Sequence, residues 1–314
     1  MARMSRFLIP HQQTTYHVIS RSALDGYPLG EQEKRLLLTI IQQLSAVYFC
    51  EVLGFCLMGN HFHLLVTMRP EDEVSDEEVR KSFQRRYGDE YTLMTGQIPF
   101  YRQKWTSLSE YVKEIKQGFT RVYNKKRGRK GTFWAERFKS VIVEKGETLI
   151  NCLAYINLNP VRAGLVDRPE EYHWSSLGYR FRSSRKDGFL SWNMGLKEYN
   201  VKSPKERLRL YREFVYARGG VDTGPVKSCL QQGRSAAFNR ASKGRILDAV
   251  ALPESVERFI QRTRFFTDAG IIGSREFVSQ GFELFRDIIQ PKRERKPHRI
   301  KGLDRIYSMK RLAT

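Results

Sequence analysis

The order of apolar patterns in the first half of the chain constrains its fold more than any other feature. Short runs of β-forming residues alternate with segments in which apolar residues recur at three- and four-residue steps. In chain order we expect strand 16–21, helix 31–48, strands 49–57 and 61–68, helix 107–122 and strand 138–144. This β-α-β-β-α-β order predicts an α+β fold of the ferredoxin-like split βαβ type, in which helices cover an antiparallel sheet.

Three further segments complete the expected organisation. A helix over 147–158 should end at Asn159-Pro160, because proline disfavours helical geometry in the residue before it. Residues 70–106 interrupt the pattern with an acidic stretch, which we interpret as an inserted surface segment that is partly helical. Residues 186–314 are basic and mainly helical in pattern, with helices expected at 204–218, 242–252, 253–266 and 274–289. We interpret 186–314 as a C-terminal accessory region.

The charge of the chain indicates the chemistry of its partner. Lys and Arg number 55 and Asp and Glu number 34, which gives a net charge of +21, while 40% of the residues are hydrophobic. That apolar content is sufficient for a globular fold, so the positive charge should lie on a folded surface that binds a polyanion. Nucleic acid is the first candidate and an anionic membrane surface the second.

Two classes of protein are disfavoured by composition. No run of about 18 apolar residues occurs, so we expect no membrane-spanning segment. The four cysteines show no CxxC spacing, which argues against a thiolate zinc site and a disulfide framework. A reducing cytoplasm is the location that these cysteines predict.

His61-Phe62-His63 is the most specific local signal for chemistry. In a strand, residues i and i+2 project from the same face, so the two imidazoles should point together. Two imidazoles on one face make a natural pair of metal ligands. The alternative is that both histidines simply occupy the polar face of a half-exposed strand.

A second signal lies on the helix before Pro160. Asn151, Tyr155 and Asn159 follow at i, i+4 and i+8 and should form one polar stripe. Tyr155 is the chemically competent residue of this stripe. The alternative is a tyrosine that spans core and solvent, which is common.

A third signal is the basic and aromatic segment 121–140, with eight bases and one acid and therefore a net charge of +7. Cations neutralise phosphates, and aromatic rings stack on unpaired bases. The alternative is a solvated loop with some core aromatics. The candidate DNA-binding residues are Arg121, Lys125, Lys126, Arg127, Arg129, Lys130, Trp134, Arg137 and Lys139.

Taken together, these signals resemble a known family. The matching stretches are YHVISRS (16–22), GFCLMGNHFHLLV (54–66), YNKKRGRKGTFWAERFKSVIVE (123–144) and YINLNPVRAGLV (155–166). In this order they resemble the REP-associated tyrosine transposases, which are single-tyrosine HUH transposases. The resemblance covers residues from about 8 to about 180. It implies an HUH endonuclease core, with residues 1–185 as the catalytic domain (including the insert 70–106) and 186–314 as the accessory region.

The resemblance also implies residue roles. His61 and His63 match the two histidines of the HUH motif, and Tyr155 matches the nucleophilic tyrosine. Asn159 falls where relatives place a Gln or Asn as third ligand, although Asn is shorter and here precedes a proline. The implied cofactor is Mg²⁺ or Mn²⁺. The implied reaction is cleavage and strand transfer of single-stranded DNA, folded into a hairpin, through a 5′-phosphotyrosine.

Two other functions stay open at this point. A domesticated protein that binds DNA hairpins without cutting them would share the whole pattern. An RNA-binding protein or ribonuclease would share the basic charge and the ferredoxin-like sheet, but it gives no role to the His pair plus Tyr155. Both DNA hypotheses predict a nucleoid-associated protein in the cytoplasm. Relatives include monomers and homodimers, so the oligomeric state is also open.

Overall fold

The computed structural model describes residues 6–9, 11–182, 188–193, 203–219, 264–289, 296–300 and 302–312. Within these ranges, no helix combines the length and the apolar character needed to cross a membrane. The helices expected at 242–252 and, for the most part, at 253–266 lie outside the described residues.

Four strands of the first half form the centre of the sheet. They are β1 (Thr14–Arg21), β2 (Cys50–Leu57), β3 (His61–Met68) and β4 (Lys139–Val143). Their order is β2-β3-β1-β4 and each pair is antiparallel. With α1 (Glu31–Ser45) between β1 and β2, and α4 (Leu108–Lys126) between β3 and β4, this is the ferredoxin-like arrangement. The predicted fold class is confirmed.

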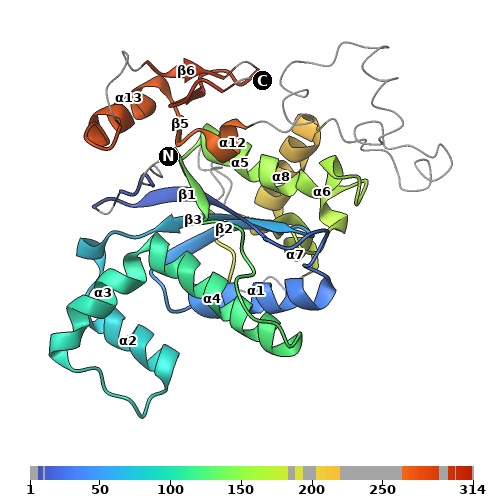
Figure 1. Cartoon of the computed structure of the whole chain (residues 1–314). Helices are drawn as coiled ribbons and strands as arrows, with labels where there is room; N and C mark the ends of the chain where they lie inside the picture. The colour runs from blue at the N-terminus through green and yellow to red at the C-terminus, as the bar shows by residue number, and fades with distance from the viewer. Residues whose placement is uncertain are drawn as a thin grey trace.

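The two faces of this sheet are covered by different helices. Figure 1 shows α1 and α4 on one side, and α5 (Glu147–Asn157) and α12 (Phe265–Asp268) on the other. Because strand residues alternate in direction, β3 sends Phe62 and Leu64 to the side of α4 and His61 and His63 to the side of α5. The apolar core and the histidine pair therefore come from the same strand.

The C-terminal part of the chain extends the sheet. β5 (Ile271–Gly273) pairs in parallel with β4, followed by β7 (Tyr307–Ser308) and β6 (His298–Arg299), which gives seven strands. The described helices after residue 186 are α8 (Pro204–Gly219), α12 and α13 (Arg275–Leu284). The accessory region thus contributes helices, as expected, and also three short strands that join it to the central sheet.

The segment 70–106 is a helical excursion at one corner of the molecule (Figure 1). It contains η1 (Glu71–Glu73), α2 (Asp76–Tyr87), η2 (Thr95–Gln97) and α3 (Ile98–Thr106). Ser75 and Glu78 form a capping box that begins α2. The prediction that this segment is partly helical is confirmed.

Short elements follow α5. They are α6 (Asn159–Arg162), η3 (Pro169–Glu171) and α7 (Ser176–Arg182). The expected break at Asn159-Pro160 is present, because α5 ends at Asn157 and a new turn of helix begins at Asn159.

Candidate active site

One pocket of about 440 Å³ brings together all four residues expected to carry the chemistry. His61 and His63 enter it from β3, and Tyr155 and Asn159 from α5 and α6. Arg137 and Lys139 line its wall at the beginning of β4. The fold therefore joins two motifs that are more than 90 positions apart in the sequence.

The two histidines are held by their Nδ1 atoms. His61 Nδ1 lies 2.8 Å from Asn60 Oδ1, and His63 Nδ1 lies 2.9 Å from Nε2 of His17. Both side chains belong to buried residues, and their ring centroids are 5.1 Å apart. Contacts of this kind fix the orientation and the tautomer of metal-binding histidines. They make Nε2 the nitrogen through which each ring would bind a metal.

His17 on β1 forms a hydrogen bond with His63 and orients its ring. The His17 Nδ1 lies 2.7 Å from the carbonyl oxygen of Phe266, which can only accept. Complete burial lowers the pKa of His17 to about 4, so the ring is neutral and carries one proton. That proton is assigned to Nδ1 by the carbonyl, so Nε2 accepts from Nδ1–H of His63. His63 then has its lone pair on Nε2, as metal binding requires.

Tyr155 is clamped between aromatic and cationic neighbours. Its ring centroid lies 4.9 Å from that of Phe266 and 6.1 Å from that of His63. The Arg162 guanidinium carbon lies 4.2 Å from the ring centroid, and the same side chain donates a 3.0 Å hydrogen bond to the Tyr155 carbonyl. Only 3% of the residue is exposed, so the tyrosine belongs to the pocket floor rather than to an open helix face.

The polar stripe predicted on this helix is buried. Asn151 is fully buried, and its Nδ2 donates to the carbonyl of Glu147 at 2.8 Å. The stripe is buried because α5 contacts β2 and β4 of the sheet and also α8 from a later segment. The i, i+4, i+8 spacing nevertheless places Tyr155 and Asn159 in the same pocket.

Asn159 fits the role of a third ligand in its donor chemistry. Its Nδ2 donates to the carbonyls of Tyr155 and Ile156, both at 3.1 Å. The amide oxygen is then the ligand atom that this side chain has to offer. Two imidazole nitrogens and one amide oxygen form a neutral set suited to a divalent cation. No group of three His, Cys, Asp or Glu side chains with metal-binding geometry occurs in the described part of the chain.

The basic residues among the predicted DNA-binding residues divide into three groups. Arg137 and Lys139 line the active-site pocket, and Lys139 pairs with Asp268 at 2.8 Å. Arg121 lines a neighbouring groove of about 950 Å³ along α4. The remaining basic residues lie at the end of α4 or in the loop that follows, where Arg127 pairs with Glu33 at 2.9 Å; they are Lys125, Lys126, Arg127, Arg129 and Lys130.

Trp134 differs from its expected role as a stacking platform for bases. It is 5% exposed, and its ring packs edge-on against Phe62 at 5.3 Å between centroids. Its indole nitrogen donates to the carbonyl of Lys116 at 3.1 Å. The structure corrects this assignment, because the ring packs into the apolar core on the α4 side and is almost wholly covered, although one edge of the residue lines the groove along α4.

The C-terminal segment supplies residues that sequence reasoning missed. Arg264, Thr267 and Asp268 line the pocket, and Phe266 contacts both His17 and Tyr155. These residues lie about 100 positions or more beyond the recognised motifs, and no spacing rule connects them to the site. One sequence signal pointed to His17, because it stands in the YHVISR stretch of the expected first strand. In the structure it lies two residues before Ile19, whose register partner is His63.

Comparison with known proteins bears on the family. No family model matches the chain. A Haemophilus influenzae protein described as a REP-associated tyrosine transposase is 26% identical over 136 residues, or 43% of this chain and 64% of that protein. This match confirms the resemblance to REP-associated tyrosine transposases. The chain thus spans less than two thirds of the length of this relative.

A solved structure also carries this family name. It is described as a REP-associated tyrosine transposase bound to a REP hairpin. The TM-score is 0.42 and the identity 17%, with 61% of this chain and 92% of that chain covered.

Proposed function

We propose that this chain cleaves single-stranded DNA and transfers the cut strand, with Tyr155 as nucleophile and a Mg²⁺ or Mn²⁺ site formed by His61, His63 and Asn159. One observation carries the proposal: these four side chains line the same pocket. The proposed reaction is the DNA-strand exchange of transposition.

The proposed chemistry is a transesterification. Attack by the Tyr155 oxygen on phosphorus forms a tyrosine–phosphate bond and breaks the bond to the 3′ oxygen. The phenolic proton is lost and the released 3′ oxygen takes up a proton, so the products are a 5′-phosphotyrosine and a 3′-OH. A second 3′-OH reverses the step and rejoins the strands. Phosphoester energy is conserved, and no nucleotide cofactor is needed.

The side chains around Tyr155 suit a reaction at a phosphate. When bound, the divalent ion supplies a Lewis acid for the scissile phosphate and offsets the developing charge. Arg137 and Lys139 lie in the same pocket and add positive potential where charge develops. The contacts of Tyr155 with Phe266 and Arg162 restrict its ring, which favours a defined line of attack.

The proposed substrate is a DNA strand with a foldback hairpin. The name of the Haemophilus relative links it to repetitive extragenic palindromes, which are hairpin-forming sequences. The Lys and Arg side chains at the end of α4 and in the following loop form a separate cationic surface, which would bind the stem of the DNA hairpin.

The test is a denaturing gel with labelled single-stranded DNA and Mg²⁺ or Mn²⁺. We expect a covalent protein–DNA adduct that disappears in Tyr155→Phe and in His61→Ala, and that persists in Tyr91→Phe, whose ring is 55% exposed on the insert. An adduct in Tyr155→Phe would show that another residue is the nucleophile. Tight binding without any adduct would instead identify a non-cleaving hairpin-binding protein.

The substrate is tested with matched oligonucleotides. A strand with a hairpin and a linear strand of the same composition are compared for the rate of adduct formation. We expect faster reaction of the hairpin strand, and equal rates would contradict the hairpin substrate.

A further inference from the structure

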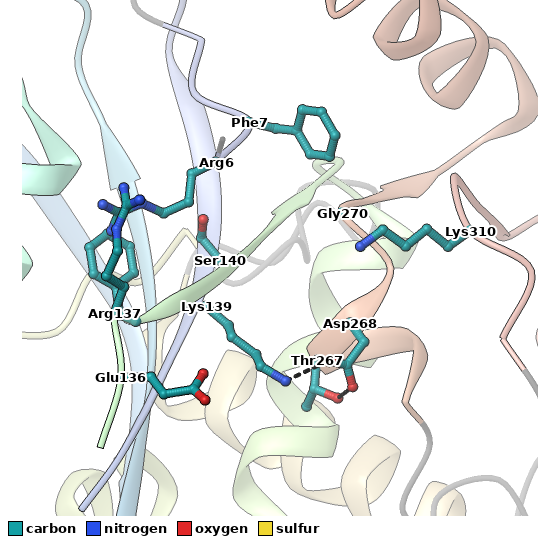
Figure 2. A pocket seen from close by; sticks show the side chains of 11 residues that line it. Arg6, Phe7, Glu136, Arg137, Lys139, Ser140, Thr267, Asp268, Gly270 and Lys310 are labelled. Atoms are coloured by element: carbon teal, nitrogen blue, oxygen red, sulfur yellow. Dashed lines mark hydrogen bonds and ion pairs between the residues drawn. The ribbon is translucent and has the colours of Figure 1, made fainter. Parts of the chain in front are cut away.

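Figure 2 shows the residues that line a second pocket. Its volume is about 400 Å³, and it shares lining residues with the active-site pocket. It is built from three segments that are far apart in the sequence: the N-terminal segment with Arg6, the beginning of β4 with Arg137 and Lys139, and the C-terminal segment with Lys310. Arg137 and Lys139 also line the active-site pocket. The two hollows therefore share a wall, and a chain-like ligand in one could continue into the other.

The charge of this second pocket is unbalanced. Four cations (Arg6, Arg137, Lys139 and Lys310) line it together with two acids, Glu136 and Asp268, which leaves 4 − 2 = +2. Asp268 is already engaged, because Lys139 lies at 2.8 Å and the Thr267 hydroxyl at 3.0 Å from its carboxylate oxygens. Its pKa is raised by burial, but these hydrogen bonds outweigh that effect and lower it overall.

Arg6 is affected by the other positive charges in this pocket. Its guanidinium carbon lies 3.9 Å from the centroid of the Phe138 ring, which fixes the side chain at the pocket wall. Its Nε is buried and has no hydrogen-bond partner among the described residues, and the same holds for the Ser140 hydroxyl in this pocket. Burial, followed by the nearby positive charge of Arg137, lowers the pKa of Arg6 to about 10.

Lys310 brings a further charge from the end of the chain. Burial lowers its pKa, and Asp268 opposes this effect while Lys139 adds to it. Like charges that are partly removed from water repel each other unless an anion joins them. The pocket therefore combines buried hydrogen-bond donors that have no partner in the described part of the chain with a net positive charge. This combination is typical of an anion-binding pocket without its ligand.

We propose that the pocket between Arg6, Arg137, Lys139 and Lys310 binds a backbone phosphate of the DNA strand next to the scissile phosphate. This inference rests on the proposed function, because the shared wall makes the second pocket the continuation of the active site. It assigns DNA contacts to two residues, Arg6 and Lys310, that lie outside the recognised motifs. The N- and C-terminal segments then meet at the substrate.

The test compares single charge-removing variants by their salt dependence. Binding of a labelled hairpin oligonucleotide with single-stranded flanks is measured between about 50 and about 200 mM salt for wild type, Arg6→Gln and Lys310→Gln. Each phosphate contact on a single strand contributes about 0.7 to the slope of log affinity against log salt. Because both side chains would contact the same phosphate, we expect the double variant to lose at most about 0.7 of slope and each single variant to lose part of that amount. The matched control is Lys81→Gln, which removes an exposed charge on α2.

A second measurement locates the phosphate. Oligonucleotides with one neutral methylphosphonate at successive positions near the cut are bound to wild type and to Lys310→Gln. We expect one position where the neutral group weakens wild-type binding at least threefold and weakens binding of the variant less, because the variant has lost one of the cations that would contact this phosphate. Equal sensitivity of both proteins at every position would overturn the inference. The same slope loss on an RNA strand without any loss on DNA would overturn the assignment to DNA.

Failure of this inference is distinguishable from failure of the proposed function. If wild type forms the Tyr155 adduct while Arg6→Gln and Lys310→Gln keep the salt slope of Lys81→Gln, only the phosphate pocket is refuted. If wild type forms no adduct on any strand, the proposed cleavage itself is refuted. Circular dichroism of each variant checks that the fold is retained.

Discussion

The two faces of the central sheet use the same strands for opposite purposes. Towards α1 and α4, β1 and β3 present Val18, Phe62 and Leu64, all fully buried in apolar surroundings. Towards α5 and α12, the alternate positions present His17 and His63, which are equally buried but joined by hydrogen bonds. One face is stabilised by packing, and the other is ordered by directed polar contacts.

This difference indicates which face of such a sheet is suited to carry a functional site. An apolar face needs only shape and volume, whereas each buried polar group on the other face needs a partner with the right geometry. On the site face, His63 obtains its partner from β1, and His17 obtains its partner Phe266 from a segment that comes much later in the chain. The residues of this face are therefore positioned by the completed fold, and variants on the two faces should fail in different ways.

The largest effect on stability is expected on the apolar face. Phe62→Ala removes a fully buried ring that packs against Trp134, and the resulting cavity should lower the free energy of unfolding by about 3–5 kcal/mol. Urea denaturation measures this change. Phe100→Ala is the control, since that ring is 62% exposed and its loss should change stability by less than about 0.5 kcal/mol. Equal effects of the two variants would contradict the assignment of Phe62 to the core.

The next effect tests the polar network of α5, the helix that covers the site face. Asn157 on α5 donates to the Leu153 carbonyl and to the Tyr211 hydroxyl, and its Oδ1 accepts from Ser176 and Leu177. Asn157→Ala leaves these buried groups without partners, so we expect a loss of about 2–3 kcal/mol in the free energy of unfolding.

The matched control for Asn157 is Asn193→Ala. Asn193 is exposed and its side chain donates to Glu51 at 3.2 Å, so its loss should cost less than about 1 kcal/mol in the same urea experiment. If Asn157→Ala leaves the free energy of unfolding unchanged, the hydrogen bonds of Asn157 do not stabilise α5, and the helix is held by apolar packing.

A smaller effect concerns metal affinity and rests on the proposed function. His17→Leu removes the acceptor that orients His63, and loss of such a partner typically weakens metal binding about 10- to 100-fold. Mn²⁺ affinity is measured by electron paramagnetic resonance, independently of DNA cleavage. We expect partial rescue in His17→Gln, which restores a polar group.

Thr15→Val provides the control for His17. Thr15 is a buried polar residue of the same strand, and its hydroxyl bonds to Thr67 at 2.8 Å rather than to a histidine. Its replacement should leave Mn²⁺ affinity unchanged. Equal loss in both variants would indicate a general disturbance of β1 rather than positioning of His63.

The smallest effect is expected at a surface contact of the insert. Hydrogen bonds from Arg69 and from the Ser75 backbone lower the pKa of Glu78 from 4.5 to about 2. Its folded-state pKa is below the unfolded value, so it stabilises the fold above pH 4.5 and this contribution is lost as the pH falls through about 2. Because the site is exposed, we expect only about 0.5–1 kcal/mol.

The measurement is the difference in urea midpoint between wild type and Glu78→Gln as a function of pH. The difference should be largest above pH 4.5 and shrink towards pH 2. A difference that stays constant over this range would show that the ionised carboxylate does not contribute.

Much of the fold was predictable because its signals are local. The two-residue period of β1 and β3 and the helical periods of α1 and α4 indicated both the element order and the orientation of His61 and His63. Trp134 was misassigned because a basic neighbourhood in the sequence says nothing about which aromatic rings are buried. The burial of the polar stripe on α5 could not be predicted for the same reason, since helical spacing shows which residues share a face but not what covers that face.

The partners of the site could not be predicted. His17 and Phe266 are 249 positions apart, yet the carbonyl of Phe266 accepts a hydrogen bond from the ring of His17. Arg6 and Lys310 lie near opposite ends of the described chain and line one pocket. No periodicity or spacing links such residues, because their proximity depends on how the late strand β5 pairs with β4.

By itself the sequence determined the α+β order, the paired histidines and the helical tyrosine, since backbone geometry converts short spacings directly into shared faces. The tertiary structure alone decided that His17 orients His63, that Phe266 closes over Tyr155 and that cations from both ends of the described chain gather beside the site. Shared faces follow from local backbone geometry, whereas contacts between distant residues follow from the packing of the whole chain.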